Sequence, residues 1–472
     1  MRGNLANLAI PAIAVTRTIA SKVEIDVCDA KNNKGENTQM NRAEKRELLK
    51  DENLLKGLVK VINNCFPELK QMLKKTESGR DTRYIRYIRY GAEEIIVVRI
   101  FGFLMGLESM NQITEKFNRD ECIENISKIL KKEGMEELPH YDTINDFFEG
   151  IDIEKLKEVN KYLVTEIIKR RMFEKNRYLG KYYIVAVDGT EIYRFDEKYC
   201  EHCLTSTYTD EKTGEKRTYY YHRVLEAKLV LGNIVISLGS EFIENEKEDV
   251  DKQDCELRAF YRLAKKIKKE YSRLQIVLLG DSLYACDPVV DVCKKSKWEY
   301  ILRVKEGRKK NLYKEYKKIK TTIKGAKGDY EIANDVVDEK KTHNVLGYKE
   351  DDVSFTWIVS FTITVKNKKE IMETGRMRWK IENEGFNTQK NHGYNLEHVY
   401  SYNYNAEKAH YLIMQIAHTI RQIGELGITQ IKKLRLSLKE ISFKLLECFR
   451  STKLTEQDIF EAEAKMQIRI ET

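Results

Sequence analysis

Proline is scarce in this sequence: 4 of the 472 residues are prolines, so long helices can run without the interruption that proline causes. Long apolar runs are missing as well. No segment approaches the roughly 18 consecutive apolar residues that a membrane-spanning helix needs, which predicts a soluble protein with no membrane partner. The nine cysteines are odd in number and widely scattered. This pattern excludes a regular disulfide framework and favours a reducing cytoplasm.

Charge is what the chain has in abundance. Charged residues make up 34% of the sequence, and the 42% of hydrophobic residues are enough to build cores. The formal net charge of +9 favours a polyanionic partner. Together with the scarcity of proline, the many lysines and glutamates predict a helix-rich α+β protein and argue against an all-β sandwich.

The apolar pattern divides the chain into regions. Residues 1–50 include a polar stretch, 31–38, that carries no apolar residue, and they are predicted to form a loose arm. From residue 51 to 178 the apolar residues recur at helical spacing, beginning with a stripe between Leu54 and Phe66. After Lys181 the period changes to that of short buried strands.

The first buried strand, 182–187, is predicted to end in a turn at Asp188-Gly189-Thr190. The elements that follow are predicted as strands at 218–231, 233–242, 275–279, 300–304 and 356–365, and as helices at 254–274, around Glu382 and beyond residue 405. A polar, lysine-rich insertion is predicted at about 305–355. This order of strands and helices is that of a mixed α/β sheet.

Three acidic residues occupy positions where they can meet. Asp188 and Asp281 each follow a buried strand, and Glu382 lies on a helix, so all three are expected at the carboxyl edge of one sheet. Carboxylate oxygens suit Mg²⁺ or Mn²⁺, and two such ions roughly 3.5–4 Å apart assist phosphoryl transfer. The alternative for each aspartate taken alone is a structural role in a turn or a helix cap.

Basic residues accompany these acids. Arg378 and Glu382 are four residues apart, which places a guanidinium and a carboxylate on one helix face. Arginine binds phosphate through two parallel hydrogen bonds, so this pair suits phosphoryl chemistry on nucleic acid. Near the N-terminal region, arginines also recur every third residue among tyrosines, at Arg80, Arg83, Arg86 and Arg89, and are predicted to contact DNA, the alternative being a solvated helix face.

The segments around the three acids resemble those of the DDE transposases of prokaryotic insertion sequences. The segments are Val187-Asp-Gly-Thr190, Leu279-Gly-Asp-Ser-Leu-Tyr284 and Arg378-Trp-Lys-Ile-Glu382. They resemble the branch whose third acid lies in a Tyr-x2-Arg-x3-Glu-x6-Lys signature, and the likeness covers about 182–422. Two positions depart from this signature: Gly375 stands at its tyrosine and Gln389 at its lysine, with Lys390 one residue later.

Helix geometry bears on these departures. On an unbroken α-helix Gln389 would lie nearly above Glu382, and Lys390 about 80° round from it. Gly385 could absorb an irregularity that changes this. Glu384 is a competing third carboxylate, but it would point to the side opposite Glu382.

The resemblance implies an RNase H-like catalytic core with a strand-rich insertion, preceded by a helical domain and followed by C-terminal helices. The expected regions are a loose arm (1–50), a helical DNA-binding region (51–178), a DDE catalytic domain (179–425) and a helical tail (426–472). Asp188, Asp281 and Glu382 would bind Mg²⁺ or Mn²⁺ and carry catalysis, while Arg378 and Lys390 would contact DNA.

The implied function is metal-dependent cleavage at transposon ends followed by strand transfer into target DNA. Its partners would be double-stranded DNA and a second copy of the chain, in the nucleoid of a prokaryotic cytoplasm. The alternatives are an RNase H-like nuclease that does not join ends and a catalytically inactive DNA-binding descendant. Cys200, Cys203 and His222 are residue types that bind zinc, but a single CxxC pair favours free thiols.

Overall fold

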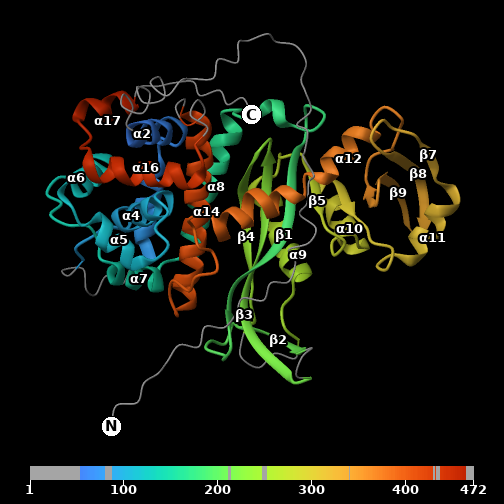
Figure 1. Ribbon diagram of the computed structural model, residues 1–472, viewed down its shortest axis with the longest axis horizontal. Coiled ribbons are helices and arrows are strands. Elements are labelled where there is room, and N and C mark those ends of the chain that lie inside the picture. The colour runs from blue at the N-terminus through green and yellow to red at the C-terminus, as the bar shows by residue number, and fades with distance from the viewer. Residues whose placement is uncertain are drawn as a thin grey trace. The chain divides into compact units, whose positions relative to one another are not determined.

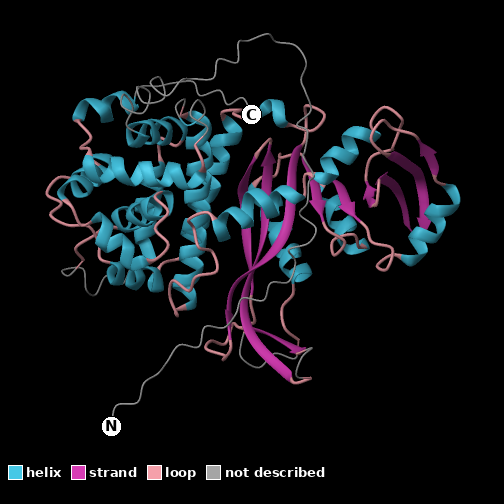
Figure 2. Ribbon diagram, in the orientation of Figure 1, coloured by secondary structure: helices cyan, strands magenta, loops and turns pink. Residues whose placement is uncertain are grey.

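Ten strands among the described residues form one mixed sheet (Figures 1 and 2). The computed structural model describes residues 54–79, 88–210, 214–246, 252–339, 341–428, 431 and 436–463. The predicted arm, 1–50, lies outside them. The strands are β1 (Tyr183–Phe195), β2 (Leu204–Thr209), β3 (Lys216–Leu231), β4 (Ile234–Ile243), β5 (Ile276–Gly280), β6 (Glu299–Arg303), β7 (Thr321–Ile323), β8 (Asp329–Asp338), β9 (Lys341–Glu350) and β10 (Val353–Val359).

The centre of the sheet has the strand order β4-β3-β1-β5-β6. The pairs β4–β3 and β3–β1 are antiparallel, whereas β1–β5 and β5–β6 are parallel. β3 and β4 form the predicted hairpin, and Gly232 supplies the positive φ of 64° that its tight turn requires. This arrangement confirms the expected α+β fold with an RNase H-like core.

Two apolar layers cover the two faces of this centre, because successive side chains of a strand point to opposite sides. Val185 and Val187 pack with α9 (Glu256–Glu270) and α10 (Asp287–Ser296). Ile184 and Ala186 pack on the other face with α12 (Lys368–Arg376) and η4 (Ile381–Asn387). Asp188 continues the even-numbered series, so its side chain belongs to the face that η4 covers.

Helices from both ends of the chain pack together beside the sheet (Figure 1). The N-terminal ones are α2 (Leu54–Cys65), α3 (Leu69–Lys74), η1 (Lys75–Gly79), α4 (Ala92–Leu104), α5 (Met110–Phe117), α6 (Asp120–Leu130), α7 (Tyr141–Gly150), α8 (Ile153–Lys169) and η3 (Glu174–Asn176). The C-terminal ones are α13 (Thr388–Asn391), α14 (Tyr404–Gly427), α16 (Leu438–Ser451) and α17 (Glu456–Glu463). None of the helices in the described ranges is long and apolar enough to cross a membrane.

Helix α14 joins the helical part to the sheet. Every residue from Ala409 to Gly424 is buried, so this helix is enclosed on all sides and not on the one stripe that its sequence predicts. It contacts α2, α4, α7 and α8 on one side and β4 on the other. A change in α14 therefore reaches both the helical part and the sheet.

The lysine-rich segment between β6 and β10 forms α11 (Lys310–Ile319) and the strands β7, β8 and β9. These strands do not make a separate sheet. β10 pairs with β6 at Trp357–Arg303, Ile358–Leu302 and Val359–Ile301, and β9, β8 and β7 follow outward in that order. The insertion is therefore an extension of the central sheet.

The turn predicted at Asp188-Gly189-Thr190 is wrong. β1 runs on to Phe195, because residues 184–195 pair with β3 along a long antiparallel ladder. The polar and glycine residues that indicate a turn lie instead within a strand, where β5 ends but β3 still supplies hydrogen-bond partners. Asp188 thus projects from a continuous strand.

Candidate active site

The pairing of β1 with β5 brings the first two acids together. The last parallel pair is Ala186 opposite Leu279, and Asp188 and Asp281 each follow their member of this pair by two positions. Parallel strands in register place such residues side by side at the same edge. The Oδ1 atom of Asp281 also accepts a hydrogen bond of 2.8 Å from the backbone nitrogen of Leu283, which fixes the turn after β5.

Arg378 connects the third acid to the first. Its Nη1 atom lies 3.2 Å from Oδ2 of Asp188 and 2.8 Å from Oε1 of Glu382. The Arg378 side chain is only 7% exposed and Asp188 18%, so this ion pair is largely buried, whereas Glu382 is 37% exposed. The guanidinium that was predicted to contact DNA phosphate here holds two of the three acids, and its contact with phosphate stays a prediction.

Asp281 belongs to the same cluster of charges. Burial and the nearby positive charge of Arg378 lower the pKa of Arg303, whereas Asp281 and Glu382 act on it in the opposite direction. Arg303 ends β6, the strand beside β5, so it borders the acids from the neighbouring strand. The structure therefore gathers Asp188, Asp281, Glu382 and two arginines at one edge of the parallel strands.

The Asp188 carboxyl group is short of positive charge. Burial raises its pKa to about 7, and the negative charges of Glu256 and Glu382 act in the same direction, although Arg378 opposes them. A carboxyl group that is costly to ionise in this way gains from a cation that takes up its charge. Carboxylate oxygens are ligands that Mg²⁺ and Mn²⁺ prefer. In the described structure, however, the oxygens of Asp188, Asp281 and Glu382 do not all lie within 4.8 Å of one another, and Arg378 Nη1 stands between Asp188 and Glu382. The acids and Arg378 would have to move before one ion could bind all three carboxylates.

This pKa gives a pH dependence that can be measured in the presence of a chelator. The unfolded pKa of an aspartate is near 3.9, so between about pH 4 and pH 7 the folded state holds a proton that the unfolded state has lost. Asp188 should therefore make unfolding easier as the pH rises through this window. Urea unfolding at several pH values measures this effect. Between pH 4 and pH 7 the free energy of unfolding should fall less steeply with pH for Asp188→Asn than for the unaltered chain. Equal slopes would contradict the raised pKa.

Glu256 is a fourth carboxylate near the site, and no sequence motif marks it. It begins α9 and is 8% exposed. Its Oε1 accepts a hydrogen bond from Tyr284 Oη at 2.6 Å, and its Oε2 forms an ion pair with Arg223 Nη2 at 2.7 Å. Because both oxygens have partners, Glu256 is suited to shaping the charge around Asp188 from the opposite face. The packing of α9 against the sheet, which no local pattern reveals, places it there.

The segment that carries Glu382 is a π-helix, η4, and not the unbroken α-helix on which the sequence argument rested. A π-helix bonds residue i to i+5, so one extra residue is accommodated within the turn. Residues after it are set back by one position. Lys390, eight residues after Glu382, therefore lies closer to the side of Glu382 than it would on an unbroken α-helix, and its correspondence with the lysine of the signature stays a prediction.

Burial agrees with this shift. Glu382 and Lys390 are both partly exposed, whereas Gln389 is fully buried. Gln389 Nε2 donates to Gln415 Oε1 of α14 at 2.8 Å and lies 3.0 Å from His418 Nδ1. The ammonium group of a lysine at position 389 would lose its hydration, and neither Gln415 nor His418 would offer it a carboxylate in return. The Lys390 Nζ lies 2.6 Å from Glu397 Oε1, and its contact with DNA stays a prediction.

The glycine at the signature's tyrosine position also has a structural cause. A Cβ atom on Gly375 would lie 2.8 Å from Nε1 and 2.9 Å from Cε2 of Trp357, and 3.1 Å from Cγ2 of Ile301. Trp357 is 2% exposed and fills the space between α12 and the sheet. The indole thus occupies the room that a side chain at position 375 would need.

The arginine series is only partly visible. Arg80, Arg83 and Arg86 lie outside the described residues. Arg89 is described: its side chain is 63% exposed, and its Nη1 pairs with Oε1 of Glu137. The predicted contact of this series with DNA stays a prediction.

Fold and residue placement together define the class of this protein. The β4-β3-β1-β5-β6 order, with acidic side chains beside β1 and β5 and on the covering helix η4, is that of an RNase H-like enzyme. Residues 179–420, more than half of the chain, match the family model described as "Transposase DDE domain". The chain therefore belongs to the DDE transposase family, as its sequence predicts.

No curated protein matches the chain. Among solved structures, the cryo-EM structure of the piggyBac transposase synaptic complex with hairpin DNA aligns with a TM-score of 0.42 and 10% sequence identity, over 84% of this chain and 80% of that chain.

Proposed function

We propose that this protein is the transposase of an insertion sequence, which cleaves the ends of its element and joins them to target DNA. The observation that carries the proposal is the meeting of Asp188, Glu382 and Arg378 at one sheet edge, within the residues that match the family. Asp281 stands at the same edge by strand register. Transposases of this family generally depend on divalent metal ions.

In this proposal Asp188, Asp281 and Glu382 hold Mg²⁺ or Mn²⁺. The ions, when bound, would promote attack by a hydroxyl group on phosphorus and stabilise the leaving oxygen. Arg378 holds Asp188 and Glu382 in place through Nη1, and its remaining donors are suited to a phosphate oxygen. Lys390, brought to the side of Glu382 by the π turn, would contact the DNA backbone as a point charge.

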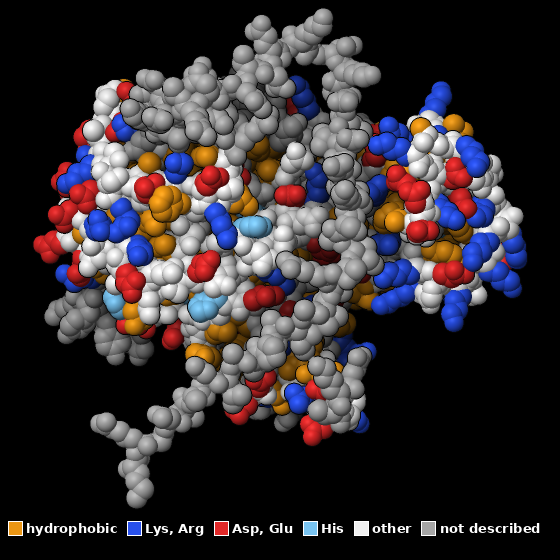
Figure 3. All heavy atoms as spheres, viewed as in Figure 1, with side chains coloured by type: hydrophobic (Ala, Val, Ile, Leu, Met, Phe, Trp, Pro, Cys, Tyr) orange, Lys and Arg blue, Asp and Glu red, His pale blue; other side chains and the backbone are white. Residues whose placement is uncertain are grey.

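The surface around the site suits a polyanion. Figure 3 shows many basic side chains over the insertion, at the right of the view, with acidic side chains among them. Helix α11 contributes Lys310, Lys314, Lys317 and Lys318. Such a surface would bind the DNA backbone without reading its sequence, and binding would weaken as salt rises. A second copy of the chain and the second DNA end would complete the assembly, in the nucleoid of a prokaryotic cell.

A strand-transfer assay tests the proposal. The purified chain is incubated with Mg²⁺, a supercoiled target plasmid and duplexes carrying the DNA that flanks its own gene. We expect cleavage that frees a 3′-hydroxyl at the element end, and covalent joining of that end to the plasmid. A duplex with a scrambled end is the control. Cleavage without joining would favour the nuclease alternative, and binding with neither reaction would favour the inactive descendant.

A further inference from the structure

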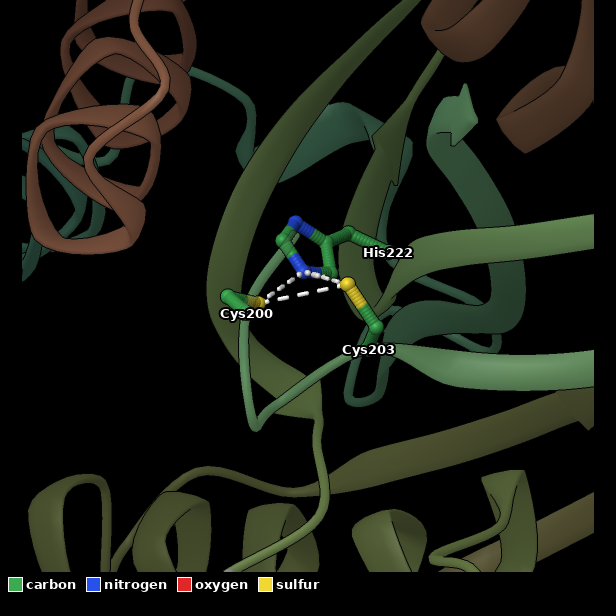
Figure 4. A group of neighbouring side chains, drawn as sticks. All are labelled: Cys200, Cys203 and His222. Atoms are coloured by element: carbon green, nitrogen blue, oxygen red, sulfur yellow. Dashed lines mark hydrogen bonds between the residues drawn. The ribbon is translucent and has the colours of Figure 1, made fainter. Parts of the chain in front are cut away.

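Two cysteines and one histidine meet at a point well away from the acids (Figure 4). The Sγ atoms of Cys200 and Cys203 are 3.3 Å apart. The Nε2 atom of His222 lies 3.1 Å from the first sulfur and 3.4 Å from the second. Figure 4 shows the imidazole ring directed at both sulfurs from the strand opposite the loop that carries them.

The strand pairing of the sheet creates this group. His222 on β3 lies opposite Tyr193 near the end of β1, and the cysteines lie in the loop between β1 and β2. Asp188 pairs with Glu226, four residues farther along β3. At about 3.3 Å per residue the group is thus roughly 13 Å along the strand from the acids. It is a second centre on the same strands.

The histidine is oriented as zinc-binding histidines are. Its Nδ1 atom lies 2.6 Å from Oε2 of Glu407, which is 3% exposed, at the start of α14. A carboxylate on Nδ1 fixes the ring and leaves Nε2 free to bind a metal. Tyr199 Oη donates to the other oxygen of Glu407 at 2.6 Å. The carboxylate is therefore itself held in place.

The spacing of the three atoms matches one small ion. With Zn–S near 2.3 Å and Zn–N near 2.0–2.1 Å, the ligand atoms of a tetrahedral site lie about 3.5–3.8 Å apart. The observed separations of 3.1–3.4 Å are slightly shorter, and a small outward movement of the loop would make room. Thiolate sulfur and imidazole nitrogen are ligands that select zinc over the hard ions proposed for the acids.

We propose that Cys200, Cys203 and His222 bind one zinc ion, with Glu407 orienting the histidine. In the part of the chain that the structure describes, no fourth Cys, His, Asp or Glu joins this group, so a water molecule would complete the tetrahedron. The ion would tie the β1–β2 loop to β3 and, through Glu407, to α14. Its role is thus to fix the far end of the strands that carry Asp188.

A second group of ligand types serves as a contrast. Asp287, Asp338 and His343 also lie close together. Between the two carboxylates, however, stands the Nζ atom of Lys309, at 3.0 Å from Asp287 and 2.7 Å from Asp338. An ammonium group already supplies the positive charge there. No cation of the chain stands in that position between Cys200, Cys203 and His222 among the contacts described for them.

Metal content tests the proposal on the full chain, purified with reductant and without added metal. Elemental mass spectrometry should find about one zinc ion per chain, and Cys203→Ser should lose nearly all of this zinc. The matched control is Cys255→Ser, which removes an exposed cysteine outside the group and should keep the zinc. Zinc absent from the unaltered chain, zinc retained by Cys203→Ser, or a Cys200–Cys203 disulfide in the freshly purified chain would overturn the proposal.

Spectroscopy of the unaltered chain and a milder variant test the site even if Cys203→Ser fails to fold. Cobalt(II) bound to the unaltered chain should give the visible bands of a tetrahedral site and a near-ultraviolet band from thiolate ligands. Glu407→Gln should keep these bands at saturation but weaken the affinity roughly 10–100-fold, because the carboxylate acts through His222. Octahedral bands without a thiolate band, or unchanged affinity in Glu407→Gln, would overturn the assignment.

Discussion

Replacing Glu382 with glutamine is expected to lower the rate of strand cleavage at element ends about 10³-fold. The amide keeps the size of the side chain but removes a charge, and the loss of one carboxylate ligand should remove about 4 kcal/mol of transition-state stabilisation from a metal-assisted reaction. DNA binding should be kept or become slightly tighter, because the glutamine no longer repels phosphate. Single-turnover cleavage and a gel-shift titration on the same duplex measure the two effects.

Glu384→Gln is the matched control for this variant. It makes the same chemical change two residues away in η4, at an exposed side chain. It should cleave at close to the original rate. If Glu382→Gln cleaved normally, or if Glu384→Gln were the variant that lost activity, the assignment of the third acid would be wrong.

Replacing Lys228 with methionine is expected to lower the free energy of unfolding by about 3–5 kcal/mol. Lys228 is fully buried in β3, where its Nζ donates to Gln415 Oε1 at 2.8 Å and lies 3.9 Å from Oε2 of the equally buried Glu226. Burial raises the pKa of Glu226, and Lys228 opposes that rise. Without the ammonium group, a buried carboxylate would remain with no counter-charge. Urea unfolding followed by circular dichroism measures the loss.

Two comparisons separate this explanation from a general effect of losing a lysine. Lys439→Met changes an exposed lysine on α16 and should cost less than about 0.5 kcal/mol. Adding Glu226→Gln to Lys228→Met removes the stranded charge and should recover part of the lost stability. A double variant less stable than Lys228→Met alone would show that the charge pair is not the cause.

The same network bears on the site. The stem of Lys228 lies under η4, because a Cβ atom on Gly385 would be 3.3 Å from its Cδ and Cε atoms. Gln415, which accepts from Lys228, also bonds Gln389 just after the π turn. Two elements thus contact the segment that carries Glu382: β3 through the stem of Lys228, and α14 through Gln415.

Sequence patterns predicted what depends on local order. The apolar runs before Asp188 and Asp281 identified strands β1 and β5, and their flanking residues identified the family. The length of β1 could not be found in this way, because the ladder with β3 that continues it to Phe195 depends on residues 25 to 38 positions away. The polar segment Asp188-Gly189-Thr190 has the composition of a turn, and only its pairing with β3 shows that it is part of a strand.

The residues around Glu382 do not keep the α-helical period that their sequence predicts. At about 100° per residue Lys390 stands to one side, and only a π turn, which no propensity scale signals, returns it. The glycine at position 375 depends on Trp357, a residue of strand β10, and Glu256 comes near Asp188 only through the packing of α9. His222 likewise meets the cysteines only because β3 folds back along β1.

The continuous sheet has a mechanical consequence. The insertion is joined to the acids by the β10–β6 ladder beside Arg303, and not by a flexible tether. Bending it away would break backbone hydrogen bonds at residues 301–303. If the chain acts on DNA as proposed, a duplex that lay against β7–β9 would meet the acids at an angle set by the twist of the sheet.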